Sequence, residues 1–110
     1  MAAVTANEFR RLALSLPDSI EAAHMGHPDF RVGGKIFATL AYPSTAFATV
    51  MLTPEQQELF VRTAAKTFRP VPGGWGRQGA TQVVLRAAKK SAVREALHVA
   101  WSNRAPGRKK

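Results

Sequence analysis

Cysteine is absent from this chain of 110 residues. Without a thiol, the chain can form no disulfide framework, no zinc–thiolate site and no thiolate nucleophile. The absence of disulfides is compatible with a reducing cytoplasm, which is the location that we expect for the protein.

Long apolar runs are also absent. No stretch approaches the length of about 20 apolar residues that a membrane-spanning helix needs. The opening residues, Met1 to Thr5, lack the basic region and apolar stretch of a signal peptide, so we expect no secretion. The length predicts one domain over residues 1–105, large enough to bury a hydrophobic core, followed by a disordered basic tail over residues 106–110.

Acidic residues are scarce in the second half of the chain. Residues 59–110 hold twelve Lys and Arg against Glu95 alone, a net charge of +11, whereas residues 1–58 carry a net charge of −2. This asymmetry favours a polyanionic partner such as DNA. The alternative is a compositional surplus, as in arginine-rich and alanine-rich proteins of high-GC genomes.

Three helices are predicted. Thr5 and Glu8 form a capping box before a helix over residues 6–16. Thr53-Pro54-Glu55 begins a second helix that ends near residue 65, and we expect it to bury Leu59 and Phe60. A third helix over residues 89–103 carries an apolar stripe from Val93 to Trp101. The predicted core comprises Phe9, Leu12, Leu16, Ile36, Leu40, Leu97 and Trp101.

Strands are predicted on both sides of the second helix. Gly33-Gly34 supplies a two-residue hairpin turn between strands at 29–33 and 35–42, and a third strand runs over 47–52. Strands at 68–71 and 81–86 flank a glycine-rich segment. Residues 19–25 are either an extended arm or a short strand. The order α-β-β-β-α-β-β-α predicts a two-layer α+β domain, with three helices against a five-stranded antiparallel sheet.

Two segments carry a family resemblance. Residues 26–38 read Gly-His-Pro-Asp-Phe-Arg-Val-Gly-Gly-Lys-Ile-Phe-Ala, and residues 72–76 read Pro-Gly-Gly-Trp-Gly. Together they resemble the MmcQ/YjbR family of small bacterial proteins, over about residues 8–102. The resemblance implies the same α+β fold and DNA binding through two hairpin-like wings, here Arg31 to Ile36 and Trp75 to Gly79. The family often has a further aromatic residue where this chain has Ala80.

The glycine-rich segment also matches a nucleotide-binding pattern. Residues 74–79 read Gly-Trp-Gly-Arg-Gln-Gly, which fits G-x-G-x-x-G. A Rossmann site needs a helix after this motif, whereas a strand is predicted, and Ala80-Thr81 replaces the Lys-Ser/Thr of a phosphate-binding loop. We therefore predict neither a Rossmann site nor a phosphate-binding loop, and a small-molecule or nucleotide site at this glycine turn is a further alternative function. Trp75 either stacks on a nucleic acid or plugs the end of the sheet.

Metal and catalytic sites are not predicted. His24, His27 and Asp29 lie close in sequence but lack further ligands, so we expect neither a metal nor another cofactor. We instead expect Asp29 to pair with Arg31 or Lys35 across the surface. The serines lack a nucleophile-elbow context, and no carboxylate pair has a suggestive spacing, so we expect no enzyme activity.

The predicted function is DNA binding with little sequence preference. Lys90, Arg94 and His98 recur at four-residue spacing as a basic ridge, with no acidic residue on the ridge itself; the alternative is an ordinary solvated helix face. No helix carries the Asn, Gln and Arg set of a major-groove reader. The alternative function is a protein-interaction or adaptor module, and a monomer or weak dimer is expected. The predicted DNA contacts are Arg31, Lys35, Trp75, Arg77, Arg86, Lys89, Lys90 and Arg94.

Overall fold

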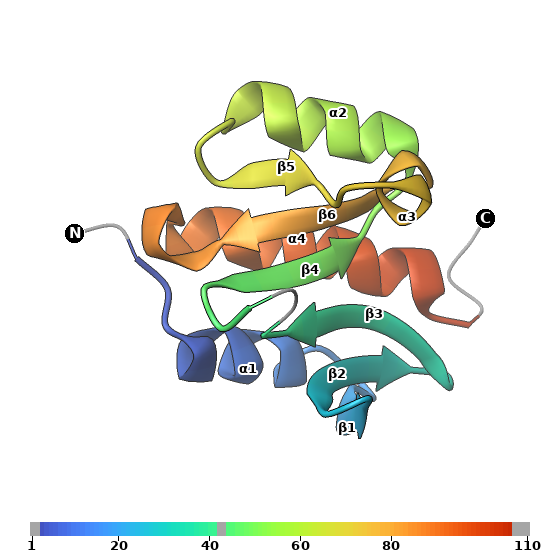
Figure 1. The fold of residues 1–110 in the computed structure, drawn as a ribbon. Coiled ribbons are helices and arrows are strands. Elements are labelled where there is room, and N and C mark those ends of the chain that lie inside the picture. The colour runs from blue at the N-terminus through green and yellow to red at the C-terminus, as the bar shows by residue number, and fades with distance from the viewer. Residues whose placement is uncertain (1–2, 42–43, 107–110) are drawn as a thin grey trace.

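The described residues form one six-stranded sheet with helices packed against it (Figure 1). The computed structural model describes residues 3–41 and 44–106. The helices are α1 (Ala6–Leu14), α2 (Pro54–Thr63), α3 (Gly74–Arg77) and α4 (Lys90–Arg104), with a short 3₁₀ helix, η1 (Leu85–Ala87). The strands are β1 (Ile20–His24), β2 (His27–Val32), β3 (Lys35–Leu40), β4 (Phe47–Met51), β5 (Phe68–Pro70) and β6 (Ala80–Val84).

The sheet confirms the predicted α+β class and corrects the strand number. Its order is β1-β2-β3-β4-β6-β5, and every neighbouring pair is antiparallel. The sixth strand is β1, whose Ile20 pairs with Arg31 of β2. This edge strand has no fully buried residue, and it therefore lacks the alternation of buried and exposed positions that predicts a strand.

The helix boundaries follow the capping chemistry read from the sequence. The predicted capping box is confirmed: the Thr5 hydroxyl accepts from the backbone N–H of Glu8, and the Glu8 side chain accepts from the backbone N–H of Thr5. The predicted start of α2 at Thr53 is also confirmed, and there the structure adds a second capping box with Gln56. The predicted strand end at residue 42 and the turn at Pro43 lie outside the described residues. Pro106, where the predicted tail begins, lies beside Gly33; residues 107–110 are likewise outside the described part.

Helices α1, α2 and α4 cover one face of the sheet. Phe9 of α1 packs on Phe30 at 6.2 Å between ring centroids, and Phe60 of α2 meets Phe68 edge-on at 5.1 Å. Of the predicted core, Phe9, Leu40, Leu97 and Trp101 are buried, whereas Leu12, Leu16 and Ile36 are half-buried.

One core prediction is wrong. Leu59 is 53% exposed, and α2 has no fully buried residue. The reason is the position of α2, which packs beside β5 at the edge of the sheet and turns only one flank, with Phe60, toward the core.

Among the residues that the structure describes, no helix combines the length and apolarity needed to cross a membrane.

Candidate functional site

A cluster of basic side chains surrounds the start of α4. Arg86 lies in η1, Lys89 is the residue that caps α4, and Lys90 and Arg94 occupy its first turns; all four are exposed. We call these four residues the basic cluster. Within the described residues, Lys90 alone of the four has an ion-pair partner, because its Nζ lies 3.9 Å from Glu8 Oε2 of α1. The predicted ridge therefore does have an acidic neighbour, supplied by another helix.

Two further predicted contacts lie at the other end of the molecule. Arg77 precedes β6 and Arg86 follows it, so the strand separates them. Lys35 begins β3 next to the turn that meets Pro106, beyond the far end of α4 (Figure 1). The 15 residues of α4 span about 22 Å. Lys35 and Arg77 are exposed, but they are not part of the basic cluster.

Arg31 is engaged in an ion pair with Asp29. Its Nε donates to Asp29 Oδ1 at 2.8 Å and its Nη2 donates to Oδ2 at 3.1 Å. The predicted pairing of these residues is confirmed, but it is not a surface pair, because Asp29 is fully buried. Alternation along β2 places both side chains on the same side of the sheet. The guanidinium fork already holds a carboxylate, which leaves Arg31 poorly suited to grip a phosphate.

The carboxylate of Asp29 stays charged in spite of its burial. The bonds from Arg31 lower the pKa of Asp29 more than desolvation raises it, and a contact with His24 Nδ1 at 2.8 Å lowers the pKa further. Asp29 in turn raises the pKa of Arg31. The three side chains form one hydrogen-bonded unit across β1 and β2.

Of the two predicted wings, Arg31 to Ile36 forms the expected hairpin turn, whereas Trp75 to Gly79 differs from the predicted turn. Gly33 and Gly34 have φ of 58° and 80°, as a two-residue turn between β2 and β3 requires. In the second, Gly74–Arg77 form the short helix α3 where only a turn is predicted. Helix α3 connects β5 to β6, so the strands around it still pair as a hairpin.

The glycines of this second segment serve close packing. A Cβ on Gly76 would lie 1.6 Å from the carbonyl oxygen of Val71, and one on Gly79 would lie 1.9 Å from that of Leu52. Backbone therefore approaches backbone at both positions, where no side chain fits. The G-x-G-x-x-G spacing has this steric cause, and β6 follows it as predicted.

A row of buried polar residues crosses the face of the sheet opposite the helices. Asp29 pairs in register with Thr39, Thr39 with Thr49, and Thr49 with Gln82. Residues directly opposite one another point to the same face, so the four side chains are neighbours. Among the described residues, the hydroxyls of Thr39 and Thr49 have no hydrogen-bond partner. Sequence analysis missed this row, because only the strand register brings its members together.

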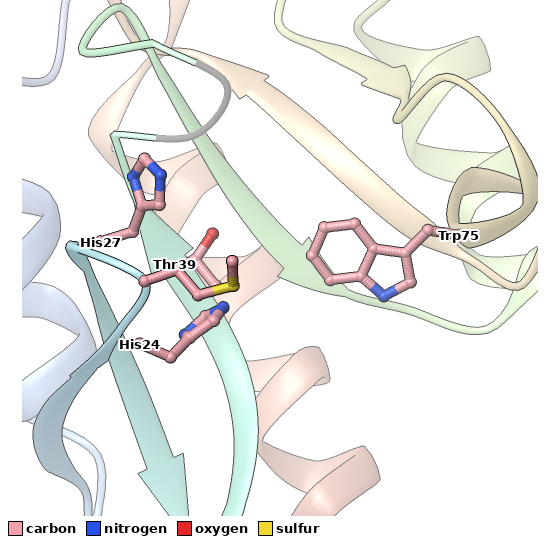
Figure 2. Close-up of a pocket in the computed structure, with 5 residues that line it drawn as sticks. His24, His27, Thr39 and Trp75 are labelled. Carbon is pink, nitrogen blue, oxygen red and sulfur yellow. The ribbon is translucent and has the colours of Figure 1, made fainter.

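A cleft of about 330 Å³ opens over this row. Its lining residues are His24, Met25, His27, Thr39 and Trp75. Figure 2 shows Trp75, on α3, across the cleft from His24, His27 and Thr39, which belong to the first three strands. Trp75 is 38% exposed and forms one wall of the cleft. In the described residues, no group of three or more His, Cys, Asp or Glu is arranged to hold a metal ion.

The fold and these motifs define a small α+β domain of a known class. The chain belongs to the YjbR family, whose model matches residues 14–103. No curated protein matches the chain. A solved structure, protein DR2400 of Deinococcus radiodurans with a DUF419 domain, is similar at a TM-score of 0.74 and 16% identity, over 92% of this chain and 78% of that one. At this identity the likeness shows the fold alone.

Proposed function

We propose that this protein binds duplex DNA through the basic cluster at the start of α4, with little sequence preference. The observation that carries the proposal is that Arg86, Lys89 and Arg94 are exposed and have no acidic partner in the described structure. Exposed cations gathered on one segment attract the phosphate backbone without reading bases.

The backbone at the start of α4 supports the same surface. Lys89 caps this helix without a side-chain hydrogen bond, since lysine has no acceptor to offer the first-turn N–H groups. These groups carry the partial positive charge of the helix end. A phosphate placed there is attracted by the amides as well as by the neighbouring cations.

The composition of α4 explains why we propose weak specificity. Its one asparagine, Asn103, donates to Met51 O at 3.1 Å and to Gln56 Oε1 at 2.8 Å, so this amide is engaged in hydrogen bonds within the chain. Base reading in the major groove relies on amide and guanidinium side chains that reach base edges. We assign Lys35 and Arg77 to secondary contacts at the other end of the domain, and we assign Arg31 to structure.

The experiment measures affinity for a labelled duplex by fluorescence anisotropy at low salt. The double variant Arg86→Ala/Arg94→Ala should weaken binding to duplexes of unrelated sequence alike and flatten the salt dependence by about one unit per residue. The matched control is Arg62→Ala, an exposed arginine of α2 paired with Glu58 at 3.3 Å. If the double variant and the control bind as the parent does, the basic cluster is not the interface.

A further inference from the structure

The cleft between the β1–β2 turn and α3 is not used by the proposed DNA interface. We propose that it binds a neutral, planar nitrogen heterocycle of nucleobase type, with the ring against Trp75 and one polar edge at Thr39. This site lies on the face of the sheet opposite α4, so the inference stands independently of the basic cluster.

The walls of the cleft favour a flat aromatic ligand. Trp75 presents a partly exposed indole on one side, and the thioether of Met25 belongs to the same lining. Tryptophan is the largest stacking surface among side chains, and sulfur makes favourable contacts with aromatic rings. The volume of about 330 Å³ lies at the lower end for ligand pockets, which limits the occupant to about one base or nucleoside.

The floor of the cleft favours a ligand with hydrogen-bonding groups on its edge. Thr39 is 2% exposed, and its hydroxyl has no partner in the described parts of the chain. A threonine hydroxyl both donates and accepts, so it can bond a ring nitrogen, a carbonyl or an amino group. Because Asp29 is ionised and lies 2.8 Å from His24 Nδ1, that nitrogen carries the proton. In the neutral imidazole, Nε2 is then an acceptor.

The charge of the lining favours a neutral ligand. None of the five lining residues is Lys, Arg, Asp or Glu. The nearby guanidinium of Arg31 is bound to Asp29 through two hydrogen bonds. A phosphate or carboxylate in the cleft would therefore lack a dedicated cation, whereas an uncharged heterocycle needs none.

Two sources can supply this chemistry, and the test separates them. One is a free nucleoside, and the other is an unpaired base of a single strand. The probes are adenosine, guanosine, cytidine and thymidine, with ribose as the control, and a short single-stranded oligonucleotide compared with its abasic analogue. Saturable binding of a nucleoside identifies a free ligand. Binding of the oligonucleotide alone, lost in the abasic analogue, identifies a strand base.

Variants tie the binding to the cleft. Thr39→Val should weaken binding about two- to tenfold, as expected for one lost hydrogen bond. Trp75→Leu should weaken it about five- to 150-fold, the range measured for stacking of one base. The matched control is Thr49→Val, which removes the adjacent buried hydroxyl outside the lining and should leave affinity unchanged. Neither valine substitution should lower the thermal midpoint, because each removes a buried hydroxyl that has no partner within the described residues.

Calorimetry and Trp fluorescence give the readout, and Arg86→Ala/Arg94→Ala should retain nucleoside affinity. If no nucleoside and no base-containing strand binds at millimolar concentration, the proposal is wrong. It is equally wrong if Thr39→Val and Trp75→Leu, both shown to be folded, bind as tightly as the parent.

Discussion

For Asp29, the sequence predicts the correct ion-pair partner but the wrong location, because the residue is buried and not at the surface. Its partnership with Arg31 follows from the two-residue spacing in a strand. Its complete burial does not, since that depends on the pairing of β1 with β2, which brings His24 against it. The result is an ionised carboxylate inside the domain whose hydrogen bonds outweigh its desolvation.

The first prediction concerns the pH dependence of this carboxylate. The pKa of Asp29 is lower in the folded state, so its stabilisation is present above about pH 4 and is lost as pH falls through the folded pKa. Asp29→Asn should therefore cost about 1–3 kcal/mol at pH 7 and much less at low pH. Urea unfolding of both proteins at pH 7 and pH 3 measures the difference. An equal loss at both pH values would contradict the assignment.

The second prediction tests the steric reading of the glycine-rich segment. Gly76→Ala should destabilise the domain by about 1–3 kcal/mol, because the new methyl group collides with the carbonyl of Val71. Gly74→Ala is the matched control, since a Cβ there would lie 3.4 Å from Arg77 Nη2, the flexible end of a side chain. Thermal unfolding compares the two. Equal midpoints would show that Gly76 is not required for packing.

At the scale of elements, sequence analysis succeeds where the pattern is local. Helix α4 is predicted within one residue at each end, because its apolar stripe repeats at helical spacing over four turns. The hairpin of β2 and β3 follows from Gly33-Gly34, whose torsions few other residues adopt. Strand β1 and helix α3 carry no such local pattern. Strand β1 is held by its pairing with β2, and Gly79, which follows α3, packs against the backbone of Leu52.

The candidate functional residues likewise fall into those that the sequence predicts and those that only the fold brings together. The basic residues could be read from sequence, because exposure and charge are expected of them anywhere on a surface. The cleft could not, because Thr39 and Trp75 come to line one cleft only when β3 and α3 are brought together in the folded domain. Only the alternation of polar Thr39 and Thr49 with apolar neighbours in their strands was available as a signal, and it also fits an ordinary solvated face.

The third prediction measures how firmly α4 is held. Trp101 is buried, and its Nε1 donates to Pro17 O at 2.9 Å, which joins α4 to the end of the α1 segment. Trp101→Ala should cost about 3–5 kcal/mol through lost burial and a cavity. Leu59→Ala, at an exposed position of α2, should change stability by less than about 0.5 kcal/mol. Similar denaturation midpoints for the two variants would contradict this packing.

At the scale of the whole molecule, the fold places the predicted basic contacts in separate regions, although most of them come from the same half of the sequence. The predicted DNA contacts separate into the basic cluster, the distant pair of Lys35 and Arg77, and the internal ion pair of Arg31. Glu8 moderates the cluster, because the backbone N–H of Thr5 lowers the pKa of Glu8 and keeps it charged beside Lys90. One end of the domain thus presents most of the proposed interface.

The fourth prediction concerns the ion pair of Glu8 with Lys90. Glu8→Gln removes the negative charge but retains a side chain that completes a capping box. Duplex affinity should rise, by at most about fivefold, as Lys90 becomes available to phosphate. The thermal midpoint serves as the folding control. Unchanged affinity in a folded variant would show that Lys90 lies outside the interface.

The salt dependence of duplex binding tests the central claim most directly. If the four residues of the basic cluster each neutralise one phosphate, log affinity should fall against log salt with a slope of about −3.6, steepening to about −5.4 if Lys35 and Arg77 also engage. The slope should be the same for unrelated duplex sequences and should flatten in Arg86→Ala/Arg94→Ala. Absence of binding at low salt, or a slope that this double variant leaves unchanged, would contradict DNA binding through the start of α4.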